Sequence, residues 1–295
     1  MTQRVVFASG KGGTGKTTFT AIVAALASRE RRVILADCDV EAANLPIALQ
    51  AEETSSESFA GGSVAVVDPE LCRGCGACVR ACRFDALIPP ERAIGSYTVD
   101  PWACEGCAAC IRTCPYGALS MQAGAPGAIV SARSIVGDLV YGILGPGEDL
   151  SGKLVTEVRT HADEAGDGSE IQFIDGPPGV GCPVIASITN TDQLIAITEP
   201  TVSGEHDLMR LVTLARRLDV PIAAVINKAD LSERGAAHLR ERLAEEGVEL
   251  IAEVPFDPAL ATTLSRFANG DDSAAAFSAE SPGEIAASTV WDWVR

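Results

Sequence analysis

The sequence contains few basic and few aromatic residues and has no long apolar run. It carries 23 lysines and arginines against 40 aspartates and glutamates, a formal net charge of −17, so binding to nucleic acid through a general basic surface is not expected. Aromatic residues make up 5% of the chain, which favours tight α/β packing over a large aromatic groove. No run of about 18 apolar residues occurs, so no membrane-spanning helix is expected.

A glycine-rich loop near the N-terminus is the first motif that indicates a function. It lies between an apolar run at residues 5–8 and a helical pattern at residues 19–27. In a nucleotide phosphate loop, backbone N–H groups surround phosphate oxygens, a lysine reaches the terminal phosphates, and a hydroxyl group holds Mg²⁺. Lys16 and Thr17 occupy the lysine and hydroxyl positions of this motif, so a plain glycine-rich turn is the weaker interpretation. The predicted nucleotide-binding residues of the loop are Gly10, Lys11, Gly12, Gly13, Thr14, Gly15, Lys16, Thr17 and Thr18.

Eight of the ten cysteines fall in two runs of identical spacing, C-x₂-C-x₂-C-x₃-C. This is the pattern of two-cluster bacterial ferredoxins, in which three cysteines of each run bind one 4Fe-4S cluster and the fourth binds the other cluster. The predicted ligands of the first cluster are Cys72, Cys75, Cys78 and Cys114, and those of the second cluster are Cys104, Cys107, Cys110 and Cys82.

Zinc and disulfide bonds are the alternatives for these cysteines. Paired C-x₂-C units also form tetrahedral zinc sites, but zinc explains only pairs, whereas the triple spacing occurs twice. The first residues run directly into the phosphate-loop motif and do not resemble a signal peptide. We therefore expect a reducing, cytoplasmic location, in which disulfide bonds are rare.

The rest of the sequence alternates between short apolar runs and helical patterns. Strands are predicted at residues 33–36, 171–174, 193–198, 222–227 and 250–254, and helices at residues 152–161, 205–218, 233–246 and 258–267. This order indicates an α/β fold with a mostly parallel sheet covered by helices on both faces. A polar stretch at residues 52–58 is interpreted as a linker. The predicted domains are a nucleotide-binding domain made of residues 1–60 and 125–295, and an inserted small α+β ferredoxin domain at residues 61–124.

With these motifs the chain resembles the MinD-like P-loop ATPases of the deviant Walker A type, the MinD, Mrp and ParA superfamily, and in particular members with an inserted two-cluster ferredoxin domain. The resemblance rests on the second lysine at the front of the loop, Lys11, and on the cysteine runs. It implies that Lys11 reaches phosphates bound by the other subunit of a dimer, while Lys16 acts in its own subunit. It also implies ATP and Mg²⁺ as ligands, and a homodimer, or a heterodimer with a related ATPase, that forms on ATP binding.

The resemblance assigns further roles outside the loop. Asp39 is expected to orient or activate the attacking water, and Asp175 is expected near Mg²⁺. Asn44 stands at the position after Asp39 that matches the motif of this family. Asp37 competes with Asp39 for the catalytic role, and a helix cap or turn is the alternative for Asp39. Residues 227–230 also match the guanine-reading Asn-Lys-x-Asp pattern, so base preference rests on the resemblance alone. The expected adenine-side residues are Asn227, Pro255, Phe256 and Asp257.

Two cysteines and the C-terminal segment fall outside these motifs. Cys38 is interpreted as a small buried residue, while Cys182 either packs beneath the second switch loop or touches a metal, a cluster or a partner. A helical segment at residues 285–295 contains Trp291 and Trp293 but only one basic residue. We expect it to dock on the protein itself, and we do not expect membrane attachment.

Three functions of different kinds are compatible with these features. The first is an ATP-hydrolysing redox protein, in which nucleotide state gates electron transfer from two 4Fe-4S clusters to a partner protein or metal centre. The second is an assembly factor similar to the Mrp-like ATPases, which carry iron–sulfur or other metal cofactors to client proteins. The third is a positioning ATPase of the MinD or ParA kind with a redox sensor. The first is favoured because it explains two redox centres in one chain with a switch ATPase.

Overall fold

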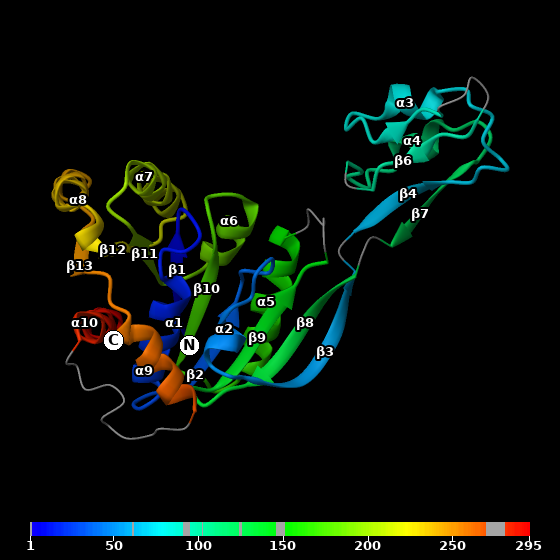
Figure 1. Cartoon of the computed structure of the whole chain (residues 1–295). Coiled ribbons are helices and arrows are strands. Elements are labelled where there is room, and N and C mark those ends of the chain that lie inside the picture. Colours follow the sequence, from blue (N-terminus) through cyan, green and yellow to red (C-terminus); the bar gives the residue numbers. More distant parts are fainter. Residues whose placement is uncertain are drawn as a thin grey trace. The chain divides into compact units, whose positions relative to one another are not determined.

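The computed structural model describes residues 2–60, 62–90, 95–101, 103–123, 126–145, 151–269 and 281–295. The chain divides into two compact units (Figure 1). Each unit has its own core of buried side chains. The larger unit consists of residues 1–57, 129–143 and 151–295, and the smaller unit of residues 58–128 and 144–150.

A sheet of nine strands, in the order β13-β12-β11-β1-β10-β2-β9-β8-β3, organises the larger unit. Neighbouring strands are parallel from β13 to β9. A helix lies in each connection from β9 to β13 and between β1 and β2, as parallel strands require. In this arrangement Asp37 at the end of β2 lies directly beside Asp175 in β10. The strands are β1 (Gln3–Ser9), β2 (Val33–Asp37), β3 (Glu52–Ala60), β8 (Pro126–Arg133), β9 (Asp138–Ile143), β10 (Ile171–Pro178), β11 (Gln193–Thr198), β12 (Ile222–Asn227) and β13 (Glu249–Val254).

Helices pack on this sheet through apolar side chains. Phe7 of β1, Phe173 of β10 and Phe19 of the first helix are each at most 1% exposed, so the core lies around the central strands. The helical elements are α1 (Lys16–Ala27), α2 (Leu45–Ala48), α5 (Ser151–Ala165), α6 (Cys182–Ile188), α7 (Val202–Arg217), η1 (Ala229–Leu231), α8 (Glu233–Glu245), α9 (Ala259–Ala268) and α10 (Pro282–Val294).

The sheet extends further than the sequence predicts. Residues 52–58, interpreted as a linker, belong to strand β3, and that interpretation is wrong. Their side chains are exposed, so they lack the apolar pattern of a buried strand, and backbone pairing with β8 defines β3 instead. Strands β8 and β9, joined by a turn at residues 134–137, were also not predicted.

The smaller unit contains two short antiparallel strand pairs and two short helices. β4 (Ser63–Val67) pairs with β7 (Leu119–Ala123), and β5 (Leu87–Ile88) pairs with β6 (Thr98–Val99). Helices α3 (Ala77–Ala81) and α4 (Ala109–Thr113) each contain the third cysteine of a run, and they lie in contact. The core of this unit is formed by buried Ala65, Cys78, Ala86, Leu87, Cys110 and Leu119.

The C-terminal helix α10 packs on the larger unit. Trp291 is 4% exposed, and its ring lies 6.4 Å from that of Phe173 and beneath the guanidinium group of Arg31. The Trp293 indole N–H donates a hydrogen bond of 2.9 Å to Glu249 Oε2. The two tryptophans therefore contact the protein itself, as expected. Within the described ranges, none of the helices combines the length and the apolar character that crossing a membrane requires.

Candidate nucleotide and cysteine sites

The phosphate-loop motif forms a turn between β1 and α1. Gly13 and Gly15 have φ angles of 80° and 93°, a region that favours glycine. A Cβ atom at Gly15 would lie 2.5 Å from Asn227 Nδ2, and this amide group donates to the Thr14 carbonyl oxygen at 2.8 Å. The buried Thr14 hydroxyl has no hydrogen-bond partner among the described residues. An unpaired hydroxyl inside the turn fits a ligand that brings acceptor oxygens, such as a phosphate.

Asp175 is the centre of a buried polar cluster at the carboxyl end of β10. Its carboxylate accepts hydrogen bonds from Lys16 Nζ at 2.7 Å, Thr17 Oγ1 at 2.6 Å and Thr20 Oγ1 at 3.0 Å. Burial alone would lower the pKa of Lys16, but the charge and the hydrogen bond of Asp175 outweigh it and raise that pKa. A cation, a hydroxyl group and a carboxylate thus stand together, as binding of phosphate and Mg²⁺ requires.

Asp37 and Asp39 differ in how far their carboxylates are buried and engaged. Asp37 is 0% exposed and accepts backbone N–H bonds from Asp39 at 3.0 Å and Leu45 at 2.9 Å, so it fixes the segment between β2 and α2. Desolvation, reinforced by the charge of Asp175, raises the pKa of Asp37 well above its ordinary value. Asp39 is half-buried, and desolvation raises its pKa to about 6 although Lys16 lowers it. Asp39 is therefore the better candidate for the group that acts on water.

Lys11 and Lys228 share one carboxylate, that of Glu199. Lys11 Nζ lies 2.7 Å from Glu199 Oε2, and Lys228 Nζ lies 2.6 Å from Glu199 Oε1. Lys228 also donates to the Gly13 carbonyl oxygen at 2.8 Å. The front lysine of the loop is thus held by a residue of the same chain in this structure.

The residues expected beside adenine have different surroundings. Asn227 is buried, and its amide faces the phosphate loop. Phe256 is 61% exposed, and its backbone N–H donates to Asp230 Oδ1 at 2.6 Å. Both carboxylate oxygens of Asp257 accept backbone N–H bonds of 2.9 Å from the first turns of α9 and α10. Asp257 therefore joins the starts of two helices, a role that the sequence did not predict.

The other predicted nucleotide-side residues lie around the same end of the sheet. Gly10 lies so close to α7 that a Cβ atom would overlap Asp207. Thr18 is half-buried on α1, and Asn44 is exposed where α2 begins. Pro255 lines a surface pocket together with Asp230.

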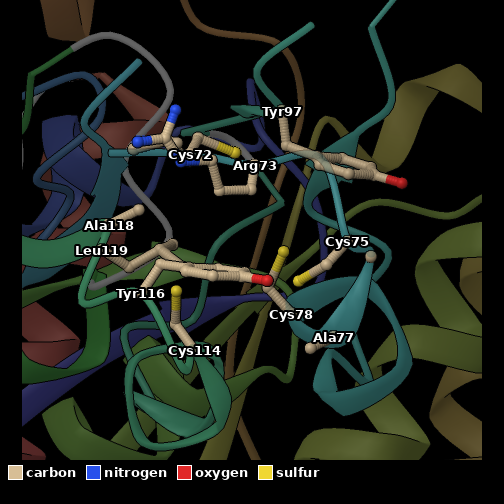
Figure 2. Close-up of a pocket in the computed structure, with 12 residues that line it drawn as sticks. Cys72, Arg73, Cys75, Ala77, Cys78, Tyr97, Cys114, Tyr116, Ala118 and Leu119 are labelled. Carbon is tan, nitrogen blue, oxygen red and sulfur yellow. The ribbon is translucent and has the colours of Figure 1, made fainter. Parts of the chain in front are cut away.

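Four cysteines from both runs line one pocket of the smaller unit, namely Cys72, Cys75, Cys78 and Cys114. Figure 2 shows these four cysteines around the pocket, which Tyr97 and Tyr116 also line. Desolvation would raise the pKa of Cys72, but hydrogen bonds from the Gly74 and Tyr97 backbone and the Ser96 hydroxyl lower it, which favours a thiolate. Burial raises the pKa of Cys78, and the neighbouring thiols Cys72 and Cys75 add to this rise.

Three of the remaining four cysteines of the runs pack in the same small core, and Cys107 is exposed. Cys104 and Cys82 are partly buried there beside the buried Cys110. The Ala65 backbone N–H donates to Cys104 Sγ at 3.4 Å, as a thiolate ligand would accept. Burial raises the pKa of the Cys110 thiol, and the charges of Cys104 and Cys107 raise it further.

No group of three or more His, Cys, Asp or Glu side chains is arranged to hold a single metal ion in the part of the chain that the structure describes. A 4Fe-4S cube distributes its four thiolates over four iron atoms, so they lie farther apart than the ligands of one ion. The fit of the cysteines to such a cube therefore rests on their shared pocket and on the N–H groups directed at their sulfur atoms.

Two polar residues of the site were missed by the sequence analysis. Thr20 lies one helical turn after Lys16, and that spacing could have placed it beside Asp175. Glu199 follows strand β11 directly, and a polar residue at the carboxyl end of a parallel strand is a known signal of a binding site. Of the two isolated cysteines, Cys38 is fully buried, as expected, and Cys182 is exposed at the start of α6.

A family model describes most of the chain. The model of the CobQ/CobB/MinD/ParA nucleotide binding domain matches residues 5–268. The chain belongs to this family. The matched range begins in β1 and ends in α9, so it includes the phosphate loop, Asp39 and Asp175.

Individual relatives extend the comparison. The chain is 34% identical over 230 residues to the uncharacterized protein MJ0578 of Methanocaldococcus jannaschii, covering 78% of this chain and 79% of that protein. It is 24% identical over 271 residues to an iron-sulfur cluster carrier protein of the same organism, covering 86% of this chain and 72% of that protein.

Solved structures show that the chain has the MinD fold, an α/β P-loop NTPase fold with a large, mostly parallel sheet. The septum site-determining protein MinD of Pyrococcus horikoshii, complexed with Mg-ADP, has a TM-score of 0.59 at 18% identity, with 100% of this chain and 96% of that chain covered. MinD in the Aquifex aeolicus MinC:MinD complex has a TM-score of 0.55 at 17% identity, with 99% and 95% covered. In a chain of this nucleotide-binding family, the cluster of Lys16, Thr17 and Asp175 is the part that suits a nucleotide with Mg²⁺.

Proposed function

We propose that this chain is an ATP-hydrolysing iron–sulfur protein in which nucleotide state gates electron transfer from two 4Fe-4S clusters to a partner protein or metal centre. Residues 61–124 form the inserted ferredoxin domain, and Lys11 is the second lysine of a deviant Walker A loop. The observation that carries the proposal is the place of the cysteine unit along the chain. It lies between Asp39, after β2, and Asp175, in β10, and these two strands are neighbours in the sheet.

This placement provides a route for coupling. Nucleotide binding alters the surroundings of Asp39 and Asp175. The chain runs from Asp39 through β3 into the insert, and it leaves the insert through β8 and β9 toward Asp175. Each cluster would supply one-electron transfer, while the protein supplies its cysteine ligands and their hydrogen bonds. A segment that changes conformation with the γ-phosphate is a common switching device.

The test is a comparison of the clusters in different nucleotide states. Anaerobic, reduced protein is prepared without nucleotide, with Mg-ADP and with Mg-ATP, and the cluster potentials and the rate of oxidation by ferricyanide are measured. We expect the ATP state to differ from the other two, and Asp39→Asn to hold the protein in the ATP-like state. Lys16→Ala is the matched control, because it should remove nucleotide dependence without touching a cysteine. Identical potentials and rates in all three states would exclude gating.

A carrier function is the second candidate, and a relative named iron-sulfur cluster carrier protein favours it. A carrier loses iron to its client, whereas an electron-transfer protein retains its iron. Incubation with an apo-ferredoxin and ATP, followed by separation and iron analysis of both proteins, distinguishes the two. Retention of iron by this chain supports the redox function, and ATP-dependent loss of iron to the apo-ferredoxin supports the carrier.

A further inference from the structure

The carboxylate of Glu199 is almost enclosed, and it meets two lysines from distant parts of the chain. Its side chain is 9% exposed, and its two oxygens lie 2.7 Å from Lys11 Nζ and 2.6 Å from Lys228 Nζ. Desolvation acts to raise the pKa of Glu199, but the hydrogen bonds and charges of the two lysines lower it. Glu199 is therefore ionised at neutral pH.

The two lysines are not held equally. Lys228 has a second short bond, to the Gly13 carbonyl oxygen at 2.8 Å, so it braces the phosphate loop as well as Glu199. Lys11 has a longer contact of 3.4 Å with Thr201 Oγ1 and is more exposed, at 34% against 24% for Lys228. Lys11 is thus the member of the cluster that can leave Glu199 with the smaller loss of bonds.

We infer that Glu199 is a positioning residue that keeps Lys11 in a resting position within its own subunit and opposes its transfer to nucleotide phosphates held by a second copy of this chain. The inference rests on the proposed role of Lys11 in an ATP-bound dimer. A half-buried ion pair must break when Lys11 moves, and a triphosphate can replace the carboxylate because it carries more negative charge. Lys228 shares the same carboxylate, so it weakens the hold of Glu199 on Lys11.

The signs of the two substitutions follow from this geometry. Glu199→Gln keeps the shape and an acceptor oxygen but removes the charge, so Lys11 is released more readily and the ATP-dependent dimer becomes tighter. Lys228→Met removes the competing cation, so Glu199 holds Lys11 more firmly and the dimer becomes weaker. Because Lys228 also bonds the Gly13 carbonyl oxygen, the opposite signs support this geometry when both variants bind ADP as the parent does.

The test measures the dimer dissociation constant by sedimentation in Mg-ATP. All variants carry Asp39→Asn, so that hydrolysis does not deplete the dimer. We expect Glu199→Gln to lower the constant about tenfold, because each dimer contains two such ion pairs, and Lys228→Met to raise it. In the Lys11→Ala background Glu199→Gln should have no effect. Glu205→Gln is the matched control, since this nearby carboxylate pairs with His238 and Arg242 instead.

Affinity for ADP, measured by calorimetry, provides a second readout of an intact site. ADP binding within twofold of the parent shows that Glu199→Gln has not damaged the loop. Glu199→Asp retains the charge, so its dimer should be weaker than that of Glu199→Gln. An unchanged or weaker dimer in Glu199→Gln, or the same tightening without Lys11, overturns the inference but leaves the proposed function in place. The absence of any Lys11-dependent dimer in ATP overturns this inference and the deviant-loop part of the proposed function together.

Discussion

The two lysines of the phosphate loop occupy different environments, and their replacement should have different effects. Lys16 is 6% exposed and paired with Asp175, whereas Lys11 lies at the edge of the site. Lys16→Ala should abolish tight ATP binding, because the phosphates lose a buried cation, and should destabilise the fold by about 3 kcal/mol, because Asp175 loses its partner.

Lys11→Ala should preserve most of the ATP affinity and lose dimerisation and hydrolysis. Calorimetric binding of ATP and sedimentation compare the two lysine variants directly. Equal loss of ATP affinity in both, with dimerisation unchanged, contradicts the assignment of different roles.

Asp39 gives a prediction that depends on pH. Its pKa of about 6 lies above the ordinary value of 3.8, mainly because of desolvation, so its charged form destabilises the folded state. The wild type therefore gains stability as the pH falls from above 6 to below 4. Asp39→Asn should be more stable than the wild type by about 1 kcal/mol at pH 7, a value reduced for solvent screening, and the difference should fade toward pH 4.

The same variant should hydrolyse ATP far more slowly, since an amide cannot act as the carboxylate does on water. Urea unfolding at several pH values and a phosphate-release assay provide the two measurements. A less stable Asp39→Asn at pH 7 would contradict the raised pKa of Asp39, and wild-type hydrolysis by this variant would assign the catalytic role elsewhere.

At the scale of elements, two glycines form a matched pair, one inside the second cysteine run and one just after it. Gly106 and Gly117 both have φ of 62°, but a Cβ atom at Gly106 would lie 2.3 Å from the Ser63 carbonyl oxygen of β4, while Gly117 has open space. Gly117→Ala should cost about 1 kcal/mol for its backbone conformation. Gly106→Ala should cost several times more, since β4 must move and the Ala65 bond to Cys104 is strained with it. Thermal unfolding and iron content of the full chain test this difference, and equal behaviour of the two variants contradicts it.

Because cysteines of both runs line one pocket, replacing Cys114 should affect the thiols of the first run. Cys114 follows α4 in sequence but lines the pocket of Cys72, Cys75 and Cys78. Cys114→Ser should therefore expose the thiols of the first run to iodoacetamide and leave Cys104, Cys107 and Cys110 protected, as peptide mass analysis would detect. Cys82→Ser should give the reverse pattern. Labelling confined to the run that carries the substitution would show that the fourth ligands do not cross.

At the scale of the whole molecule, the metal content distinguishes the proposed clusters from zinc. Anaerobically prepared protein should contain about eight irons and eight acid-labile sulfides per chain, as two cubes require. Plasma emission analysis of iron and zinc, together with a sulfide assay, measures this directly. Zinc without labile sulfide would replace the ferredoxin interpretation with tetrahedral zinc sites.

Much of this molecule could be predicted from local pattern. The strands at residues 193–198 and 222–227 have the predicted bounds, because continuous apolar runs must be buried between two layers of helices. The phosphate loop was recognisable because its glycine positions are imposed by the approach of the backbone to a ligand. Strand β3 was not, because its polar side chains remain in water and backbone pairing with β8 makes it a strand.

The order of residues specifies which chemical groups are present and which are adjacent along the chain, namely the loop lysines, the Asp-Cys-Asp segment and the two cysteine runs. How these groups are used depends on the folded structure. It engaged both oxygens of Asp37 with backbone N–H groups and left Asp39 half-buried, and it placed Glu199 between Lys11 and Lys228. These interactions depend on contacts between segments far apart in sequence. The burial that makes such ion pairs strong exists only after the parallel strands have assembled.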